Sequence, residues 1–240
     1  MIRRTPFIFA HTPYDSTDFE AGCHRFSDLL HQLEGISPYV RTNTLLTTED
    51  QMKSGVGLDP LNNMEEVIEV FREHFPDSFA IDGIKSIWGE RWEGGKNVVK
   101  IKYKWGGGSQ SLICESSISS PIPSQDTALN IWLRVIETII NWKRPLYLWC
   151  GDEAYFYKGK GVFDPERTIA NWICWVPQQV DPSLIPSASL VRPMLDGTLI
   201  VTSDQYFNID DEPAIHRAND VEMEMNEAGI LPHQSDLMKG

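Results

Sequence analysis

The segment Asn97–Trp105 (NVVKIKYKW) is the strongest indication of β-structure, because polar and apolar residues alternate along part of it. Three glycines, Gly106–Gly108, follow it, and the chain then returns through Ser109–Ser116. Glycine allows the positive φ angles that a tight turn needs, so this pattern predicts a β-hairpin. The lysines at alternate positions from Lys100 to Lys104 fall on one side of the strand, which predicts a solvated face there.

Four segments on either side of this hairpin have helical spacing of apolar residues, and capping residues predict their ends. The expected helices are Asp18–Glu34 (N-cap Thr17, stop at Gly35), one from Asn62 or Asn63 to Pro76, Gln125–Trp142 behind Ser124, and Pro213–Ala228 with Gly229 as its C′ residue. The third is apolar around most of its circumference, which is typical of a central core helix.

Short apolar runs predict further strands at Leu146–Cys150, Thr168–Val176 and Gly197–Thr202. Helices and strands are interspersed without a regular βαβ repeat. This order predicts an α+β fold in which an antiparallel or mixed sheet is packed by several helices. Because no repeat or linker divides the chain, we expect a single domain over residues 1–240.

Composition narrows the function. The 240 residues carry a net charge of −13, which disfavours direct nucleic-acid binding and suits a basic protein partner. The sequence has no apolar run long enough for a membrane span and no signal-peptide core, so we expect a cytoplasmic protein. The four cysteines are far apart in the sequence and are expected to be buried free thiols: Cys23, Cys114, Cys150 and Cys174.

No standard catalytic or cofactor-binding motif is present in the sequence. Lys160 lies between Gly159 and Gly161, which resembles a phosphate loop only weakly and predicts a turn between strands. One helix face has metal-ligand spacing through Glu20, His24, Asp28 and His31, although a solvated helix face explains it as well. The carboxylates between Asp204 and Glu212 could likewise form an active site, although helix capping is the simpler interpretation.

Acidic residues gather near the carboxyl end. Nine follow Ser203, and only Arg217 and Lys239 oppose them. Such runs are often merely solvated, but this one also forms a candidate surface for a basic partner. On the last predicted helix, Asp220, Glu224 and Glu227 are expected to share one face, opposite an apolar face of Ala214, Ala218, Val221 and Met225.

Residues 145–232 resemble the immunity protein 52 family of bacterial polymorphic toxin systems. The resemblance rests on Phe163–Arg167 (FDPER), Trp172, Trp175–Pro177, Leu184–Pro186 with Ala188, Gly197–Thr202, Ala218–Glu222, Asn226 and Gly229–Pro232. It implies a cytoplasmic antidote, without cofactor, metal or catalytic residues, that is encoded beside a toxin of a type VI secretion system. The expected toxin is a DNase of the restriction-endonuclease fold.

A toxin that cuts DNA has a basic substrate groove, so we expect acidic side chains outside the core to contact it. The candidate toxin-binding residues are Asp152, Glu153, Asp210, Asp211, Glu212, Asp220, Glu224 and Glu227. Two alternatives stay open: a metal-dependent enzyme of unknown class, and a non-catalytic adaptor. Trp88, Trp92 and Trp105 are either core residues or a surface for a homo-oligomer.

Overall fold

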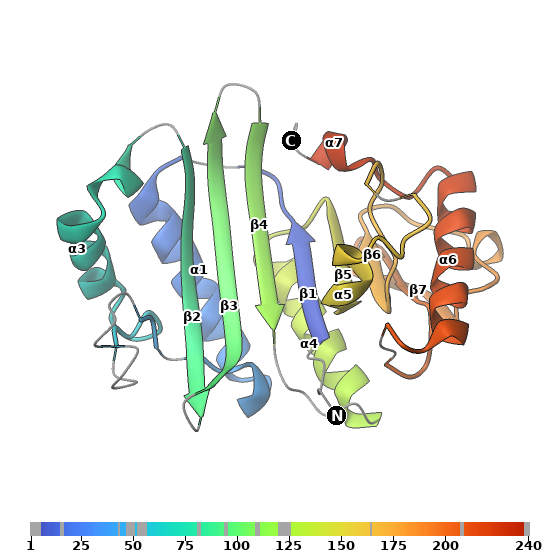
Figure 1. Cartoon of the computed structure of the whole chain (residues 1–240), viewed down its shortest axis with the longest axis horizontal. Coiled ribbons are helices and arrows are strands. Elements are labelled where there is room, and N and C mark those ends of the chain that lie inside the picture. The colour runs from blue at the N-terminus through green and yellow to red at the C-terminus, as the bar shows by residue number, and fades with distance from the viewer. Residues whose placement is uncertain are drawn as a thin grey trace. The chain divides into compact units, whose positions relative to one another are not determined.

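The computed structural model describes residues 6–14, 17–42, 44–46, 51, 57–80, 83–93, 96–108, 111–119, 126–163, 165–206 and 209–237. It confirms the α+β class, with antiparallel strands packed by helices (Figure 1). Contacts divide the chain into two compact units, Tyr14–Ser120 and Met1–Pro13 with Pro121–Gly240. The single domain expected over residues 1–240 stays a prediction.

In the described part of the unit Tyr14–Ser120, antiparallel strands pair in the order β2 (Gly83–Glu93), β3 (Lys96–Gly108) and β4 (Ser111–Ser119). The expected hairpin is therefore confirmed, although β3 continues through the glycines, and the turn at 109–110 lies outside the described residues. Gly106, at φ 94°, sits inside β3. Lys100 is exposed whereas Val99 and Ile101 are buried, which confirms the alternation.

Among the described residues of this unit, the sheet is accompanied by helices α1 (Phe19–Glu34) and α3 (Met64–His74), with short 3₁₀ turns at Pro38–Val40 and Pro76–Phe79. Helix α1 packs on β3, because the Phe19 ring stacks on Trp105 at 5.7 Å and the Trp105 indole donates to the Asp18 carbonyl at 3.1 Å. Trp105 is thus a core residue, while Trp88 and Trp92 are half-buried.

The expected N-cap of α1 is wrong, whereas its expected end before Gly35 is confirmed. Asp18, not Thr17, is the N-cap, because its carboxylate accepts from the Ala21 amide at 2.7 Å. Aspartate is one of the preferred N-cap residues. At the other end, Gly35 has φ −76° and continues the right-handed conformation. The helix ends before this residue as expected, although its right-handed conformation does not require a glycine.

In the described part of the other unit, antiparallel strands pair in the order β1 (Pro6–His11), β5 (Tyr147–Asp152), β6 (Ile173–Val176), β8 (Gly197–Val201) and β7 (Leu190–Met194). Its helices are α4 (Asp126–Trp142), α5 (Glu153–Tyr157), α6 (Glu212–Glu227) and α7 (Gln234–Leu237), with a 3₁₀ turn at Pro182–Leu184. In Figure 1, α4 lies behind the sheet and α5 in front of it. None of the described helices is both long and apolar enough to cross a membrane.

The sequence prediction of this unit was partly wrong. The strand expected from Thr168 begins only at Ile173, because Asn171 adopts a positive φ of 53° and breaks the extended chain. The turn at Gly159 follows helix α5 rather than a strand. Gly229, at φ 70°, does end α6 as expected. On α4, the exposed polar side chains form one stripe: Asn130, Arg134, Glu137 and Asn141. The Ser124 cap lies outside the described residues.

Candidate functional site

The acidic candidates occupy three kinds of environment. Six of them are exposed, namely Glu153, Asp210, Asp211, Glu212, Asp220 and Glu227. Glu224 is half-buried, and Asp152 is only 2% exposed. These six side chains reach solvent, whereas Asp152 is held inside the unit.

Three exposed candidates form one open hollow at the start of α6. Asp210, Asp211, Glu212 and Pro213 line a volume of about 590 Å³. The local sequence explains this arrangement: Asp211 caps the helix by accepting from the Ala214 amide at 3.3 Å, and Pro213 fits the first turn, where no amide donor is needed. Carboxylates in this position also favour the helix dipole. The hollow therefore presents three carboxylates to solvent.

The expectation that Asp152 lies on the surface is wrong. One carboxylate oxygen accepts from the Ala154 amide at 2.8 Å and caps α5, and the other accepts from the Ile209 amide at 3.0 Å. Both oxygens thus satisfy buried backbone donors. Next to it, Glu153 is exposed, and its pKa is raised by partial burial and by the neighbouring Asp152 carboxylate. At this end of β5, Asp152 therefore stabilises the fold, whereas the side chain of Glu153 is exposed.

The expected common face of α6 also needs correction. Asp220 and Glu227 point to solvent, but Glu224 turns toward the loop before β7, where it accepts from the Ser187 hydroxyl at 2.6 Å and the Ser187 amide at 3.1 Å. Met223, which is 41% exposed, lies between Asp220 and Glu227 on the solvent side. The exposed side of the helix is therefore acidic with one apolar residue inside it.

Glu222, which the sequence analysis missed, supports the candidate site from the interior of the unit. It is fully buried, and its carboxylate accepts from the Val162 amide at 2.8 Å, the Ala170 amide at 3.0 Å and the Tyr155 hydroxyl at 3.0 Å. These bonds tie α6 to α5 and to the loop that follows it. The helical spacing gave a signal, because Glu222 is four residues after Ala218 and three before Met225, both of which are buried.

The inner face of α6 fixes the helix on the sheet. Its buried residues are Ile215, Ala218, Val221, Glu222 and Met225, so Ile215 replaces the expected Ala214. Met225 reaches β6, where its sulfur lies 3.8 Å from the Cys174 thiol. A helix anchored in this way presents its acidic side on a rigid support.

The alternative metal face does not gather into a ligand set. Glu20 binds Arg72, and His24 lies 3.5 Å from Glu65, so both side chains point to α3. Within the described parts of the chain, no three His, Cys, Asp or Glu side chains are placed to hold one ion. Asp28 and His31 are exposed on the same helix.

Three of the four cysteines are buried and free, as expected: Cys23, Cys150 and Cys174. Burial raises the pKa of each thiol, in the case of Cys174 to about 12. Such thiols are protonated near neutral pH and react slowly. The side chain of Cys114 lies outside the described residues.

The residues that carry the family resemblance are mainly structural. Trp172 is buried and donates to the Ser203 carbonyl at 2.9 Å, and Trp175 is buried and donates to the Met194 carbonyl at 3.1 Å. Arg167 donates to the Leu231 carbonyl at 2.7 Å, which fastens the segment after α6. This confirms that both tryptophans pack in the interior.

Comparison with known proteins shows a likeness of fold. No family model matches the sequence, and no curated protein matches it. Among solved structures, the Pseudomonas aeruginosa T6SS protein PA0821 is similar to this chain, with a TM-score of 0.52 and 11% sequence identity. The similarity covers 92% of this chain and 72% of that protein. At this identity, the comparison defines a shared α+β architecture.

Proposed function

We propose that this chain is an immunity protein that binds and neutralises a cognate antibacterial toxin. The observation that carries the proposal is the acidic hollow, in which three exposed carboxylates are fixed at the start of an anchored helix. The printed name of the structural neighbour, a T6SS protein, supports a role in such a secretion system. The resemblance of residues 145–232 to an immunity family points the same way.

The expected toxin is a DNase of the restriction-endonuclease fold, encoded by a neighbouring gene. A DNA-cutting enzyme has a basic groove that holds phosphates, so an acidic surface can cover it and compete with the substrate. In this mechanism the Asp210–Glu212 carboxylates bind lysine or arginine side chains of the groove, while Asp220 and Glu227 extend the acidic surface along α6. The antidote itself needs no catalytic group, cofactor or nucleic-acid contact and acts in the cytoplasm.

Charge reversal at the hollow tests this proposal. Asp210→Lys and Glu212→Lys reverse two charges, while Asp211→Asn keeps a good N-cap and removes the third. The matched control is Glu66→Gln, Glu69→Lys and Glu73→Lys on α3, whose residues are exposed and whose total charge change is the same. Binding of the purified toxin should weaken by about tenfold or more in the first variant, chiefly through slower association at low salt.

The control separates contact from net charge. If both triple variants lose the same amount of affinity for the toxin, the effect comes from overall charge, and the hollow is not the contact surface. If neither variant changes the dissociation constant, the acidic surface takes no part in binding. Bound metal in the purified protein, or toxin binding that leaves DNA cleavage intact, would instead favour the enzyme or the adaptor alternative.

A further inference from the structure

The outer edge of strand β2 is open over part of its length. On one side β2 pairs with β3. On its other side, the Glu90 amide donates to the Thr44 carbonyl at 2.6 Å, and the Glu90 carbonyl accepts from the Thr44 amide at 3.1 Å. Since backbone groups alternate in direction along a strand, those of Ile84, Ser86 and Trp88 point to this same side. The described residues offer these three no backbone partner there.

The open stretch of β2 carries an apolar surface. Ile84 is 59% exposed, and Trp88 is half-buried against Phe71, with ring centroids 6.4 Å apart. Phe71 also contacts Phe75, which is 42% exposed, so the apolar surface continues from the strand to the end of α3. An apolar strand edge without a proline or an exposed charge is a site where a further strand adds readily.

The charges close to this edge are held within the chain. Lys85, between Ile84 and Ser86, is only 3% exposed, so a strand placed beside it would not take its charge out of water. On the neighbouring strand, Lys100 forms a 3.2 Å ion pair with Glu90 and lies over the Trp88 ring, 5.6 Å from its centroid. A second strand at this edge therefore has little electrostatic cost.

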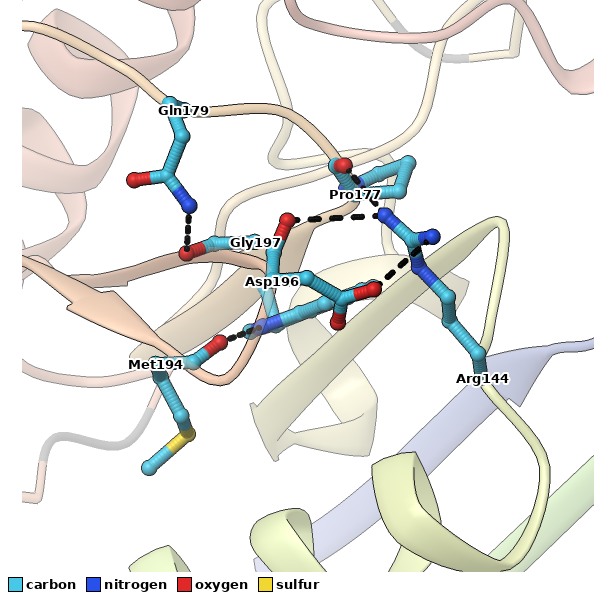
Figure 2. A network of polar contacts seen from close by, with 7 residues as sticks. Arg144, Pro177, Gln179, Met194, Asp196 and Gly197 are labelled. Carbon is cyan, nitrogen blue, oxygen red and sulfur yellow. Dashed lines mark hydrogen bonds and ion pairs between the residues drawn. The ribbon is translucent and has the colours of Figure 1, made fainter.

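The edge strand of the other unit has the opposite character. Pro193 in β7 lacks an N–H, and Arg192 beside it is exposed, both of which disfavour strand addition. The turn that follows β7 is held by side chains of its own chain (Figure 2). There Arg144 donates to the Asp196 carbonyl at 3.4 Å and forms a 3.0 Å ion pair with the Asp196 carboxylate. The outer edge of β2 is the better site for a further strand.

We infer that a second copy of this chain adds its own β2 to this edge, so that the two chains form one continuous antiparallel sheet. The sequence of the open stretch is self-complementary in this direction. A two-fold axis at Ser86 places the two serines opposite each other and Ile84 opposite Trp88 of the second copy, so small faces small and apolar faces apolar. This register also gives every outward amide of the stretch a carbonyl acceptor. The inference needs no toxin and is independent of the proposed function.

Both ends of the open stretch fit this pairing. Beyond Trp88 the edge is occupied by Thr44, so the added strand has to leave it there. In the two-fold register, the residue that follows the paired stretch at this end is Gly83 of the second copy. Gly83 has φ 108°, which is outside the extended region, so the added strand bends before it meets Thr44.

Cysteine cross-linking tests the register. Ser86→Cys places two thiols opposite each other, with about 5.5 Å between the Cα atoms, which is within disulfide range. Ile84→Cys is the matched control, because it is exposed on the same edge but its two copies lie about 13 Å apart along the strands. On oxidation, the full chain with Ser86→Cys should become mostly covalent dimer, whereas the chain with Ile84→Cys should stay mostly uncross-linked.

Sedimentation equilibrium of the purified full chain measures the dimer itself. Ile84→Ser removes an apolar contact that occurs twice in the dimer, so the dissociation constant should rise by about tenfold or more. Leu190→Ser makes a similar change at an exposed position of the other edge strand, β7, and should leave the dissociation constant unchanged. Because backbone pairing and apolar contacts hold the dimer, a higher salt concentration should not weaken it.

Each result decides the inference. A wild-type chain that stays monomeric at about 100 μM would overturn it, whether or not the chain binds a toxin. A dimer that responds equally to Ile84→Ser and Leu190→Ser has its contact elsewhere and would also overturn it. Equal cross-linking of the two cysteine variants would contradict the two-fold register at Ser86. If the chain forms this dimer but does not bind the toxin, only the proposed function fails.

Discussion

The side-chain amide of Asn171 pairs with the backbone of Asp152 as a neighbouring strand would. Its oxygen accepts from the Asp152 amide at 3.2 Å, and its nitrogen donates to the Asp152 carbonyl at 3.0 Å. Asn171 is fully buried at φ 53°, a conformation that asparagine tolerates better than most residues. A side chain at Gly151 would overlap the Asn171 amide, so the pairing needs glycine there.

Replacing Asn171 should destabilise the fold strongly. Asn171→Ala leaves the Asp152 amide and carbonyl without these partners and places alanine at a positive φ, so the free energy of unfolding should fall by about 2–4 kcal/mol. Urea denaturation measures this change. Asn130→Ala, on the exposed stripe of α4, is the control and should stay within about 0.5 kcal/mol of wild type. Equal effects of the two substitutions would contradict the strand-like pairing.

Glu222→Gln tests the buried link between α6 and the loop after α5. A glutamine keeps one oxygen acceptor but turns an NH₂ group toward backbone donors, so at least one buried amide loses its partner. The free energy of unfolding should decrease by about 1–3 kcal/mol. Glu227→Gln makes the same chemical change at an exposed position of the same helix and should have little effect. A Glu222→Gln protein as stable as wild type would refute the role of this carboxylate.

Replacement of two glycines in the unit Tyr14–Ser120 by alanine should change the stability in opposite directions. Glycine to alanine usually stabilises a helix, but a side chain at Gly22 would overlap the Trp105 ring, so Gly22→Ala should destabilise by about 1–3 kcal/mol. Gly35→Ala has open space and a right-handed φ, and it should stabilise by up to about 1 kcal/mol. Thermal unfolding of the two variants decides the matter. Changes of the same sign would contradict the close packing of α1 on β3.

His11 should make stability depend on pH. Burial lowers its pKa from 6.5 to about 4. Between these values the unfolded chain binds more protons than the folded one, so the contribution is complete above about pH 6.5 and is lost as the pH falls toward 4. Through this group, the unfolding free energy of the wild-type protein should fall by about 2 kcal/mol between pH 7 and pH 5. The His11→Gln variant should not show this part of the decrease.

The matching control for this titration is His216→Gln, because His216 is exposed on α6. Its pH profile should follow that of the wild type. If His11→Gln loses as much stability between pH 7 and pH 5 as the wild-type protein, the half-buried imidazole of His11 does not cause the pH dependence.

Local sequence patterns were sufficient to predict the helices and strands whose contacts are local. The helical repeat through Phe26 and Leu30 predicts α1, and the alternation around Ile101 predicts β3. Strand β1 escaped prediction because it is short and its partner β5 lies far along the sequence. Edge strand β7 escaped because it contains Pro193 and is largely exposed, so it has neither a typical composition nor a buried face.

The candidate site was predictable only in part for the same reason. Charge alone marked Asp210 to Glu212, and these residues are exposed around one hollow. The burial of Asp152 depends on the Ile209 amide, and that of Glu222 on the Val162 and Ala170 amides. Since these donors are roughly 50 to 60 positions away, only the fold reveals which acidic residues hold the structure together.

The most direct test of the proposed function uses the protein encoded by the neighbouring gene. The two purified proteins are mixed, the dissociation constant is measured, and cleavage of plasmid DNA is followed with and without this chain. The proposal predicts binding at about nanomolar concentration or tighter, with cleavage abolished at equimolar antidote. Absence of binding, together with a toxicity in cells that this chain does not relieve, would contradict it.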